Sequence, residues 1–194
     1  MGMTGRRALW TAHIKGNCKP RARAVKADTA PFTGTVLGID PSLRGSGFSV
    51  IEASAMHTIR LLDSLTLKLG ASKSFTECLG EIFLTTQRLL KEYPITAVAI
   101  EQTIYVQNVR TAHILGSARG ACLSAAALAN IPVQEFTPLR IKKSITGHGQ
   151  ATKQQVLQMV MKLLHLSSPL PYDESDASAA ALCYCFSSKG LSYV

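Results

Sequence analysis

Apolar residues open the patterned part of the chain in three short runs. Residues 35–40, 47–53 and 58–67 are rich in β-branched and apolar side chains, and tight turns separate them. Such runs joined by turns indicate an antiparallel meander. Two later apolar runs of strand length, residues 96–101 and 131–136, predict two further strands. The chain is therefore expected to contribute five strands.

Helical spacing follows the meander. Residues 73–93 carry apolar side chains three and four positions apart, and Pro94 follows the predicted helix end. Thr137 supplies a capping hydroxyl and the next residue is proline, which together predict a helix start. Further helices are expected over residues 106–129, 152–166 and 173–186. The order β-β-β-α-β-α-β-α-α-α favours an α/β fold in which helices flank a mixed five-stranded sheet.

Composition places the chain among folded proteins of the reducing compartments. Of 194 residues, 46% are hydrophobic and 17% charged, which is typical of a globular domain with a substantial core. Five cysteines are scattered along the chain, and Cys183 and Cys185 stand too close for a usual zinc pair. Buried free thiols are expected. No uncharged apolar run reaches the length of about 18 residues typical of a membrane span.

Positive charge is concentrated in the first residues. The net charge is +9, and residues 1–33 hold seven basic residues against one acid, whereas residues 34–194 hold 14 against 11. We interpret residues 1–33 as a basic, disordered leader and residues 34–194 as one folded domain. A tail that contacts nucleic acid, extra residues from an upstream start codon and an organellar transit peptide are alternatives, although this leader contains no serine.

Two predicted strands end on a carboxylate. Residues 35–40 end on Asp40, and residues 96–101 end on Glu101. If these strands are parallel neighbours, both acids emerge at one edge of the sheet, where α/β folds place their sites. Like charges at that spacing repel unless a cation neutralises them. The alternatives are a turn-forming aspartate and a strand-end glutamate that faces water.

Two further acids stand at the start of the last predicted helix. Asp173 and Asp176 are three positions apart and share a helix face, and the apolar run behind Asp176 directs that face inward. Complementing the helix dipole is the alternative role, and for Glu174 it is the role expected. Oxygen-only carboxylate clusters favour Mg²⁺ or Mn²⁺ and suit two-metal hydrolysis of phosphodiesters.

Four segments, in order over about residues 35–187, resemble the successive signatures of the RuvC family of bacterial Holliday-junction resolvases. They read LGIDPS…GSGFSVIE, AIEQ…QN…A…LGSARG, TPLRIKKSITGHGQATKQQV and DESDASAAALC. The resemblance implies an RNase H-like fold and a homodimer that resolves four-way DNA junctions by paired symmetric nicks, in recombination and repair. It implies a Mg²⁺-dependent endodeoxyribonuclease with two ions per active site, for which Mn²⁺ can substitute.

The resemblance also assigns residues and partners. The catalytic acids and metal ligands fall at Asp40, Glu101, Asp173 and Asp176. One metal would activate the attacking water and the other would stabilise the leaving 3′ oxygen. We expect Asp40 to bridge both ions, because it ends the central predicted strand. Branch-migration motor proteins of the RuvA/RuvB type are the expected protein partners, and the bacterial cytoplasm is the expected location.

The resemblance places two DNA-binding lysines at Lys142 and Lys153, on either side of a Gly147-His148-Gly149 loop whose glycines allow close approach to a phosphate. Solvated lysines around a helix–helix turn are the alternative interpretation. Further DNA-binding candidates are Lys143, Arg140, Tyr105 and Arg119, and for Arg119 support of the site is an equal alternative.

Two positions depart from the family pattern. Ser42 stands where the family usually has glycine after the catalytic aspartate, and Ile104 stands where it often has phenylalanine. Base stacking by Tyr105 or wedging by Ile104 would replace that phenylalanine. A Gly116-x-x-x-Gly120 segment allows close helix approach, which suits a dimer face or ordinary core packing equally.

Three other functions remain in competition with resolution of DNA junctions. An RNase H-like nuclease that acts on structured RNA would share Asp40 and Glu101. A catalytically silent junction-binding protein would not need the complete acid set. A sugar-kinase-like ATPase would need a second glycine-rich phosphate loop, which the chain lacks.

Overall fold

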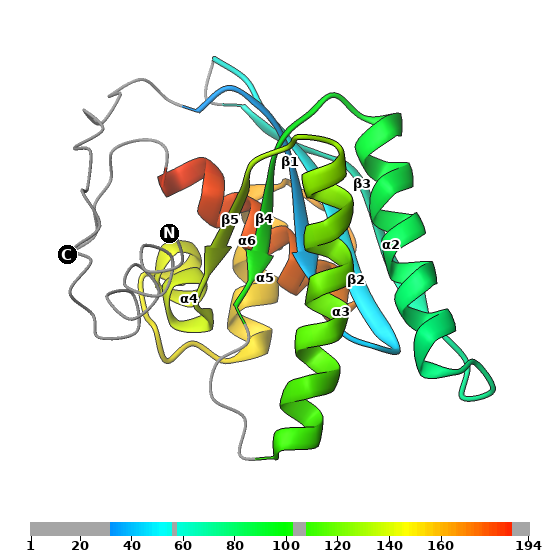
Figure 1. Ribbon diagram of the computed structural model, residues 1–194. Coiled ribbons are helices and arrows are strands. Elements are labelled where there is room, and N and C mark those ends of the chain that lie inside the picture. The colour runs from blue at the N-terminus through cyan, green and yellow to red at the C-terminus, as the bar shows by residue number, and fades with distance from the viewer. Residues whose placement is uncertain (1–31, 56–57, 103–107, 188–194) are drawn as a thin grey trace, which may run out of the picture.

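The computed structural model describes residues 32–55, 58–102 and 108–187, and a five-stranded mixed sheet lies at its centre (Figure 1). The strand order is β3-β2-β1-β4-β5, with β1 paired antiparallel to β2 and parallel to β4. The strands are β1 Gly34–Asp40, β2 Gly45–Ala53, β3 Ile59–Lys68, β4 Ile95–Glu101 and β5 Val133–Phe136. The predicted meander and mixed sheet are confirmed.

Within the described residues, five helices follow the predicted order. They are α2 Phe75–Glu92, α3 Val109–Leu128, α4 Pro138–Thr146, α5 Lys153–Leu163 and α6 Tyr172–Ser187. The starts of α2 to α5 are set by side chains that accept hydrogen bonds from the first free N–H groups: Ser74 and Thr152 form capping boxes, and Asn108 and Thr137 cap α3 and α4. Helix α3 begins at Val109, later than the pattern of small residues predicted, because Asn108 is its N-cap.

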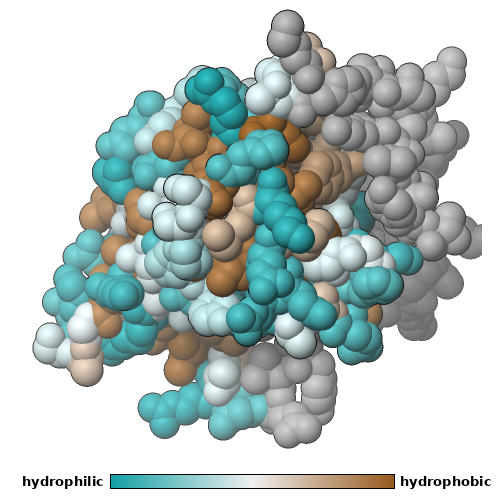
Figure 2. Space-filling view, turned by 180° about the vertical axis from the view of Figure 1, so that it is seen from behind, coloured by the Kyte–Doolittle hydropathy of each residue, from teal (hydrophilic) through white to brown (hydrophobic). Residues whose placement is uncertain are grey.

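The helices cover the two faces of the sheet. Alternate residues of β1 point to opposite sides, so Leu37 and Ile39 pack with α2 and α3, whereas Val36 packs in the cluster that contains α4, α5 and α6. Figure 1 shows α3 in front of the sheet and α6 behind it. Figure 2, seen from behind, shows apolar residues in the middle of that face with hydrophilic residues around and between them.

Helix α6 lies against the backbone of the central strands. A Cβ added at Gly38 would stand 2.0 Å from the carbonyl oxygen of Ala177, so only glycine allows the helix to come this close. The small residues of α6, from Ala177 to Ala181, are buried at this contact. Close packing of α6 determines where the acids in its first turn lie.

The described cysteines are free and buried, as expected: Cys78, Cys122, Cys183 and Cys185. Within the described residues, no helix has both the length and the apolar character needed to cross a membrane. Residues 1–31, which make up nearly all of the predicted leader, and the DNA-binding candidates Ile104 and Tyr105 lie outside the described residues.

Candidate active site

Asp40 and Glu101 meet at the same edge of the sheet. They end β1 and β4, which are parallel neighbours, and each directly follows a residue of the pair Ile39–Ile100. Asp40 continues the β1 face of Val36 and Gly38, and Glu101 continues the β4 face of Ala99, so both acids lie on the side covered by α6. The geometry brings the two strand-end acids together as predicted.

The start of α6 supplies the other two acids, Asp173 in its first turn and Asp176 directly after it. Asp176 lies beside Asp40 and Glu101, and its side chain is only 15% exposed. Asp173 lies over the start of β2, where a Cβ added at Gly47 would stand 1.9 Å from its carbonyl oxygen and one at Gly45 3.5 Å from its Oδ2. Two glycines of β2 therefore make room for the turn that presents Asp173.

Three of the four acids line one cavity of about 210 Å³ between the sheet edge and the helices. Two cationic side chains enter it from α4 and α5. The lining residues are Asp40, Glu101, Asp176, Lys142, Lys153, Pro138, Ile141 and Val156. Asp173 is outside this lining, although its charge acts on Asp40. The cavity thus combines an acidic floor with a basic and apolar wall.

Burial and mutual repulsion change the acidity of the strand-end carboxyls. Removal from water, followed by repulsion from Asp176 and Asp173, raises the pKa of Asp40 from 3.8 to about 6, against the opposing effect of Lys153. Burial, with repulsion from Asp40 and Asp176, raises the pKa of Glu101 from 4.5 to about 7. The site therefore holds negative charge at a cost that a bound cation would offset.

Lys153 provides part of the positive charge that offsets these carboxylates. Its Nζ donates to Asp176 Oδ2 at 2.9 Å, and this hydrogen bond raises the pKa of the lysine. The Lys153 side chain is 68% exposed, so its ammonium group reaches the cavity from the solvent side. The predicted DNA-binding lysine is thus, in this structure, the ion-pair partner of a predicted metal ligand.

The donor set fits a hard divalent cation in its chemistry. Asp40, Glu101, Asp173 and Asp176 offer carboxylate oxygens, the donors that Mg²⁺ and Mn²⁺ prefer. The raised pKa values of Asp40 and Glu101 indicate that positive charge is in deficit there. As the side chains stand in the described residues, no three His, Cys, Asp or Glu groups are close enough together to enclose a metal ion.

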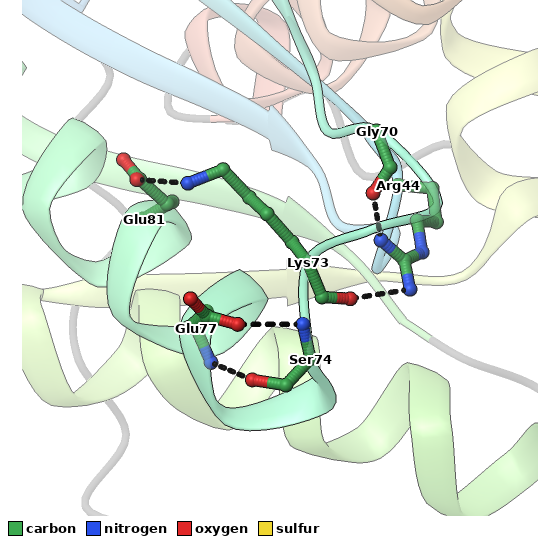
Figure 3. Close-up of polar contacts among 6 residues, drawn as sticks. All are labelled: Arg44, Gly70, Lys73, Ser74, Glu77 and Glu81. Atoms are coloured by element: carbon green, nitrogen blue, oxygen red, sulfur yellow. Dashed lines mark hydrogen bonds and ion pairs between the residues drawn. The ribbon is translucent and has the colours of Figure 1, made fainter.

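The hairpin after Asp40 is held by Arg44. Its guanidinium donates to the carbonyl oxygens of Gly70 and Lys73, the latter at 2.9 Å (Figure 3). In return, the Leu69 N–H donates to the Arg44 carbonyl oxygen at 3.0 Å. The hairpin is thereby fastened to the loop before α2, whose start is closed by its own capping box (Figure 3).

Ser42, the departure from the usual family glycine, takes part in the same turn. Its N–H donates to Ser46 Oγ at 3.0 Å, and the Ser46 hydroxyl donates back to the Ser42 carbonyl oxygen. The turn after Asp40 is therefore closed by side-chain hydrogen bonds. The sequence did not indicate this role for Ser46 or the anchoring role of Arg44, because both depend on partners that only folding brings near.

The remaining DNA-binding candidates differ in whether they line the cavity or contact other side chains. Lys142 lines it, whereas Lys143 is outside its lining. The guanidinium of Arg119, on α3, pairs with Glu135 on β5, which is the geometry of a residue that supports the sheet. The guanidinium of Arg140 lies 5.1 Å above the ring of Phe136.

Glu174 has contacts that the sequence did not indicate. Its carboxylate accepts hydrogen bonds from the hydroxyls of Ser64 and Thr66 on β3. The first-turn position had suggested only a favourable interaction with the helix dipole. The partners are more than 100 residues away along the chain, so no local pattern could have found them.

Known proteins are similar to this chain in both sequence and structure. The family model described as "Crossover junction endodeoxyribonuclease RuvC" matches residues 36–184. A protein of that name from Halorhodospira halophila is 42% identical over 149 residues, covering 77% of this chain and 88% of the relative. Its counterpart from Acinetobacter baylyi is 37% identical over 157 residues, covering 81% of this chain and 86% of the relative.

Solved structures of Holliday junction resolvases are also similar to this chain. "T. thermophilus RuvC in complex with Holliday junction substrate" matches with a TM-score of 0.77 and 32% identity, over 81% of this chain and 96% of that chain. The yeast mitochondrial Holliday junction resolvase Ydc2 matches with a TM-score of 0.59 and 8% identity, over 82% of each chain, and supports the fold alone. The predicted RNase H-like fold is confirmed.

Proposed function

Because the chain belongs to the RuvC family of crossover junction endodeoxyribonucleases, we propose that it resolves four-way DNA junctions by paired, symmetric, metal-dependent nicks. One observation carries the proposal: Asp40, Glu101 and Asp176, from two strands and a helix, line one cavity together with Lys142 and Lys153. A nuclease needs both sets of charges in one place, since the acids hold metal and the lysines hold the phosphate backbone.

We propose Mg²⁺ as the metal, held by Asp40, Glu101, Asp173 and Asp176. When bound, a pair of such ions supplies an activated water and a counter-charge for the leaving 3′ oxygen. Asp40 is the best candidate for a ligand shared by both ions, because it ends the central strand and its pKa responds to both Asp173 and Asp176. The pKa of Glu101 in turn responds to Asp40.

The lysines have two successive partners in this proposal. Without DNA, Lys153 balances Asp176 through their ion pair. With the carboxylates holding a metal, the exposed ammonium group of Lys153 would be available to a phosphate, and Lys142 on α4 would contact the same DNA strand. By holding the DNA backbone at the edge of the cavity, the two lysines would orient the scissile phosphate toward the acids. This is a positioning role with no base specificity.

The DNA would lie over α4 and α5. Residues 137–165 contain no acid and five basic residues, whereas the rest of residues 34–194 holds nine basic residues against 11 acids. The net positive charge of the domain is thus concentrated in this helical pair and the loop between its members. A hollow of about 480 Å³, lined by the end of α4, the loop after it and α5, adds His148, Gln155 and Lys162 as further polar groups.

The proposed unit is a homodimer that presents one site to each of two opposed strands. A Cβ added at Gly116 or Gly120 on α3 would meet no heavy atom within 4 Å among the described residues. Core packing within the described part of the chain therefore does not explain these glycines, which supports α3 as the dimer face. Motor proteins of the RuvA/RuvB type are proposed as further partners on the family resemblance alone.

The domain boundaries are part of the proposal. The family match begins at residue 36 and the first strand at Gly34, which supports a nuclease domain over residues 34–194. We assign the basic residues 1–33 no part in cleavage. A form that starts near residue 32 should therefore cut junctions at the rate of the full chain.

Cleavage of a synthetic mobile four-way junction in Mg²⁺ tests the function. Linear duplex and an RNA–DNA hybrid serve as controls, and Asp40→Asn serves as the matched variant. We expect paired nicks in opposed strands that are lost in the variant while junction binding persists. Binding without cutting in Mg²⁺ and Mn²⁺ would indicate a silent junction-binding protein, and cutting of the hybrid alone would place the chain elsewhere among RNase H-like nucleases.

A further inference from the structure

We propose that Glu174 is a positioning residue that holds the first turn of α6, and with it Asp173 and Asp176, in register with the sheet. Ser64 and Thr66 of β3 each donate a hydrogen bond to the Glu174 carboxylate. We call Glu174, Ser64 and Thr66 the α6 latch. The inference rests on the proposed function, in which the two aspartates are metal ligands.

The latch uses both oxygens of the Glu174 carboxylate. Ser64 Oγ donates to Oε2 at 2.6 Å, and Thr66 Oγ1 donates to Oε1 at 3.1 Å. The two hydroxyls are two positions apart on one strand, so they stand on the same face of β3 and can be met by one side chain. Hydrogen bonds to an ionised carboxylate are stronger than those between neutral groups.

Helix α6 needs such a hold because its start lacks the usual local one. Helices α2 to α5 each begin after a serine, asparagine or threonine that caps the first turn. Helix α6 instead begins at Tyr172, directly after Pro171, whose side chain has no hydrogen-bonding atom. An uncapped first turn frays readily. Here that turn carries Asp173 and leads directly to Asp176, so a tertiary contact has to order it.

The position of Glu174 couples the latch to the site. It stands between Asp173 and Asp176 in the same turn, and the Asp173 backbone lies on Gly47 of β2 with no room for a side chain between them. One turn further, the hydroxyl of Ser178 donates to the Glu174 carbonyl oxygen at 2.7 Å and lies 2.8 Å from the Ser49 hydroxyl. Polar contacts therefore join α6 to β2 and β3 along its first two turns.

Two other roles for Glu174 make different predictions. An acid that only complements the helix dipole would be insensitive to the loss of the β3 hydroxyls. A metal ligand would direct its carboxylate toward Asp40 and Glu101 at the ends of β1 and β4, whereas the Glu174 carboxylate is directed to β3, at the edge of the sheet beyond β2. With both oxygens engaged by hydroxyls on β3, the carboxylate is committed to the sheet.

Four variants test the latch. Glu174→Ala removes the acceptor, Glu174→Gln keeps the size and one acceptor oxygen, Thr66→Val removes a donor, and Thr66→Ser retains it. Glu52→Ala is the control, because it removes an acid whose ion pair with Arg60 lies at the other end of β2. Three properties are measured: amide hydrogen exchange of α6 without metal, Mn²⁺ affinity by paramagnetic resonance, and junction affinity without metal.

Glu174→Ala is expected to speed exchange in the first two turns of α6 and to weaken Mn²⁺ binding by about tenfold, as is usual for residues that orient metal ligands. Thr66→Val acts in the same direction, and combining it with Glu174→Ala adds little, because both changes break one contact. Glu174→Gln has a smaller effect, and Thr66→Ser and Glu52→Ala behave as wild type. Junction affinity stays within about twofold throughout, since Lys142 and Lys153 are untouched.

Two results would overturn the latch. Unchanged exchange and Mn²⁺ affinity in Glu174→Ala would show that the contact positions nothing. Loss of Mn²⁺ binding in Glu174→Gln as complete as in Asp176→Asn, with exchange unchanged, would make Glu174 a ligand. If wild type neither binds Mn²⁺ nor cuts junctions, the proposed function fails, whereas the exchange of α6 in Glu174→Ala still decides whether the latch exists.

Discussion

Lys153 and Asp176 meet at 2.9 Å although they belong to two different helices, Lys153 as the first residue of α5 and Asp176 near the start of α6. Their ion pair lies at the cavity that Asp40 and Glu101 share, so the lysine stands where positive charge is most needed. The same ammonium group is our candidate for a phosphate contact. Lys153 thus supplies a counter-charge to Asp176, and in our proposal it contacts a phosphate once metal and DNA bind.

Lys153→Gln should separate these two roles. We expect weaker junction binding at every sequence, with the slope of log affinity against log salt reduced by about one, because one phosphate contact is lost. Mn²⁺ affinity without DNA should stay unchanged or rise, since the competing cation has gone. Electrophoretic mobility shifts over a salt series and Mn²⁺ titration measure the two effects. A fall in Mn²⁺ affinity would contradict the balancing role.

The metal-free protein should lose stability as pH rises. The folded-state pKa values of about 6 for Asp40 and about 7 for Glu101 lie above their ordinary values of 3.8 and 4.5. The folded state therefore binds more protons than the unfolded state between about pH 4 and pH 7, and stability declines through that window. Melting temperatures in EDTA at pH 5 and pH 8 measure the decline.

Asp40→Asn supplies the control for that measurement. It removes the share of the decline due to Asp40, so the melting temperature should differ less between pH 5 and pH 8 than in wild type. At pH 8 without metal the variant should melt higher than wild type, by about 2–4 °C for each kcal/mol recovered. An equal decline in both proteins would mean that burial of the Asp40 charge costs little.

Gly47→Ala should displace the acids of α6. The new Cβ would stand 1.9 Å from the carbonyl oxygen of Asp173, so the helix start must move. We expect a loss of about 1–3 kcal/mol in the free energy of unfolding, as for other overpacked sites. Cleavage should fall further than stability alone explains, while junction binding persists.

The matched substitution for Gly47→Ala is Gly80→Ala on α2, where an added Cβ meets nothing within 4 Å. It should be neutral or stabilising by up to about 1 kcal/mol, because alanine favours the helix more than glycine does. Denaturant unfolding of both variants makes the comparison. Equal stability of the two variants would show that α6 tolerates a side chain beneath Asp173.

Gly116→Leu tests the dimer face. Because nothing among the described residues lies within 4 Å of a Cβ at this position, the larger side chain should not disturb the monomer. If α3 faces a second copy, the leucine would hold the two helices apart. The dissociation constant of the dimer would then rise tenfold or more, which makes the free energy of association less favourable by at least about 1.4 kcal/mol. Sedimentation velocity measures the dimer fraction, and an unchanged fraction would place the interface elsewhere.

Local patterns in the sequence were sufficient for most of the elements and for naming the four acids as candidates. The apolar runs in 35–40 and 96–101 specified strands that end on Asp40 and Glu101, and capping residues such as Thr137 specified helix starts. These features depend on neighbours within a few positions, which is the range over which sequence periodicity carries information. The start of α3 differs from the predicted one, because Asn108, which was not recognised as a cap, sets its first turn.

The sequence by itself determined which residues could do the chemistry, and the tertiary structure decided which of them meet. Pairing of β1 with β4 places Asp40 beside Glu101, and packing of α6 on Gly38 and Gly47 brings in the other acids. The ion pair of Lys153 and the hydrogen bonds of Glu174 join residues 23 and about 110 positions apart. Such contacts have no signature in local sequence, because they form only when distant elements share a surface.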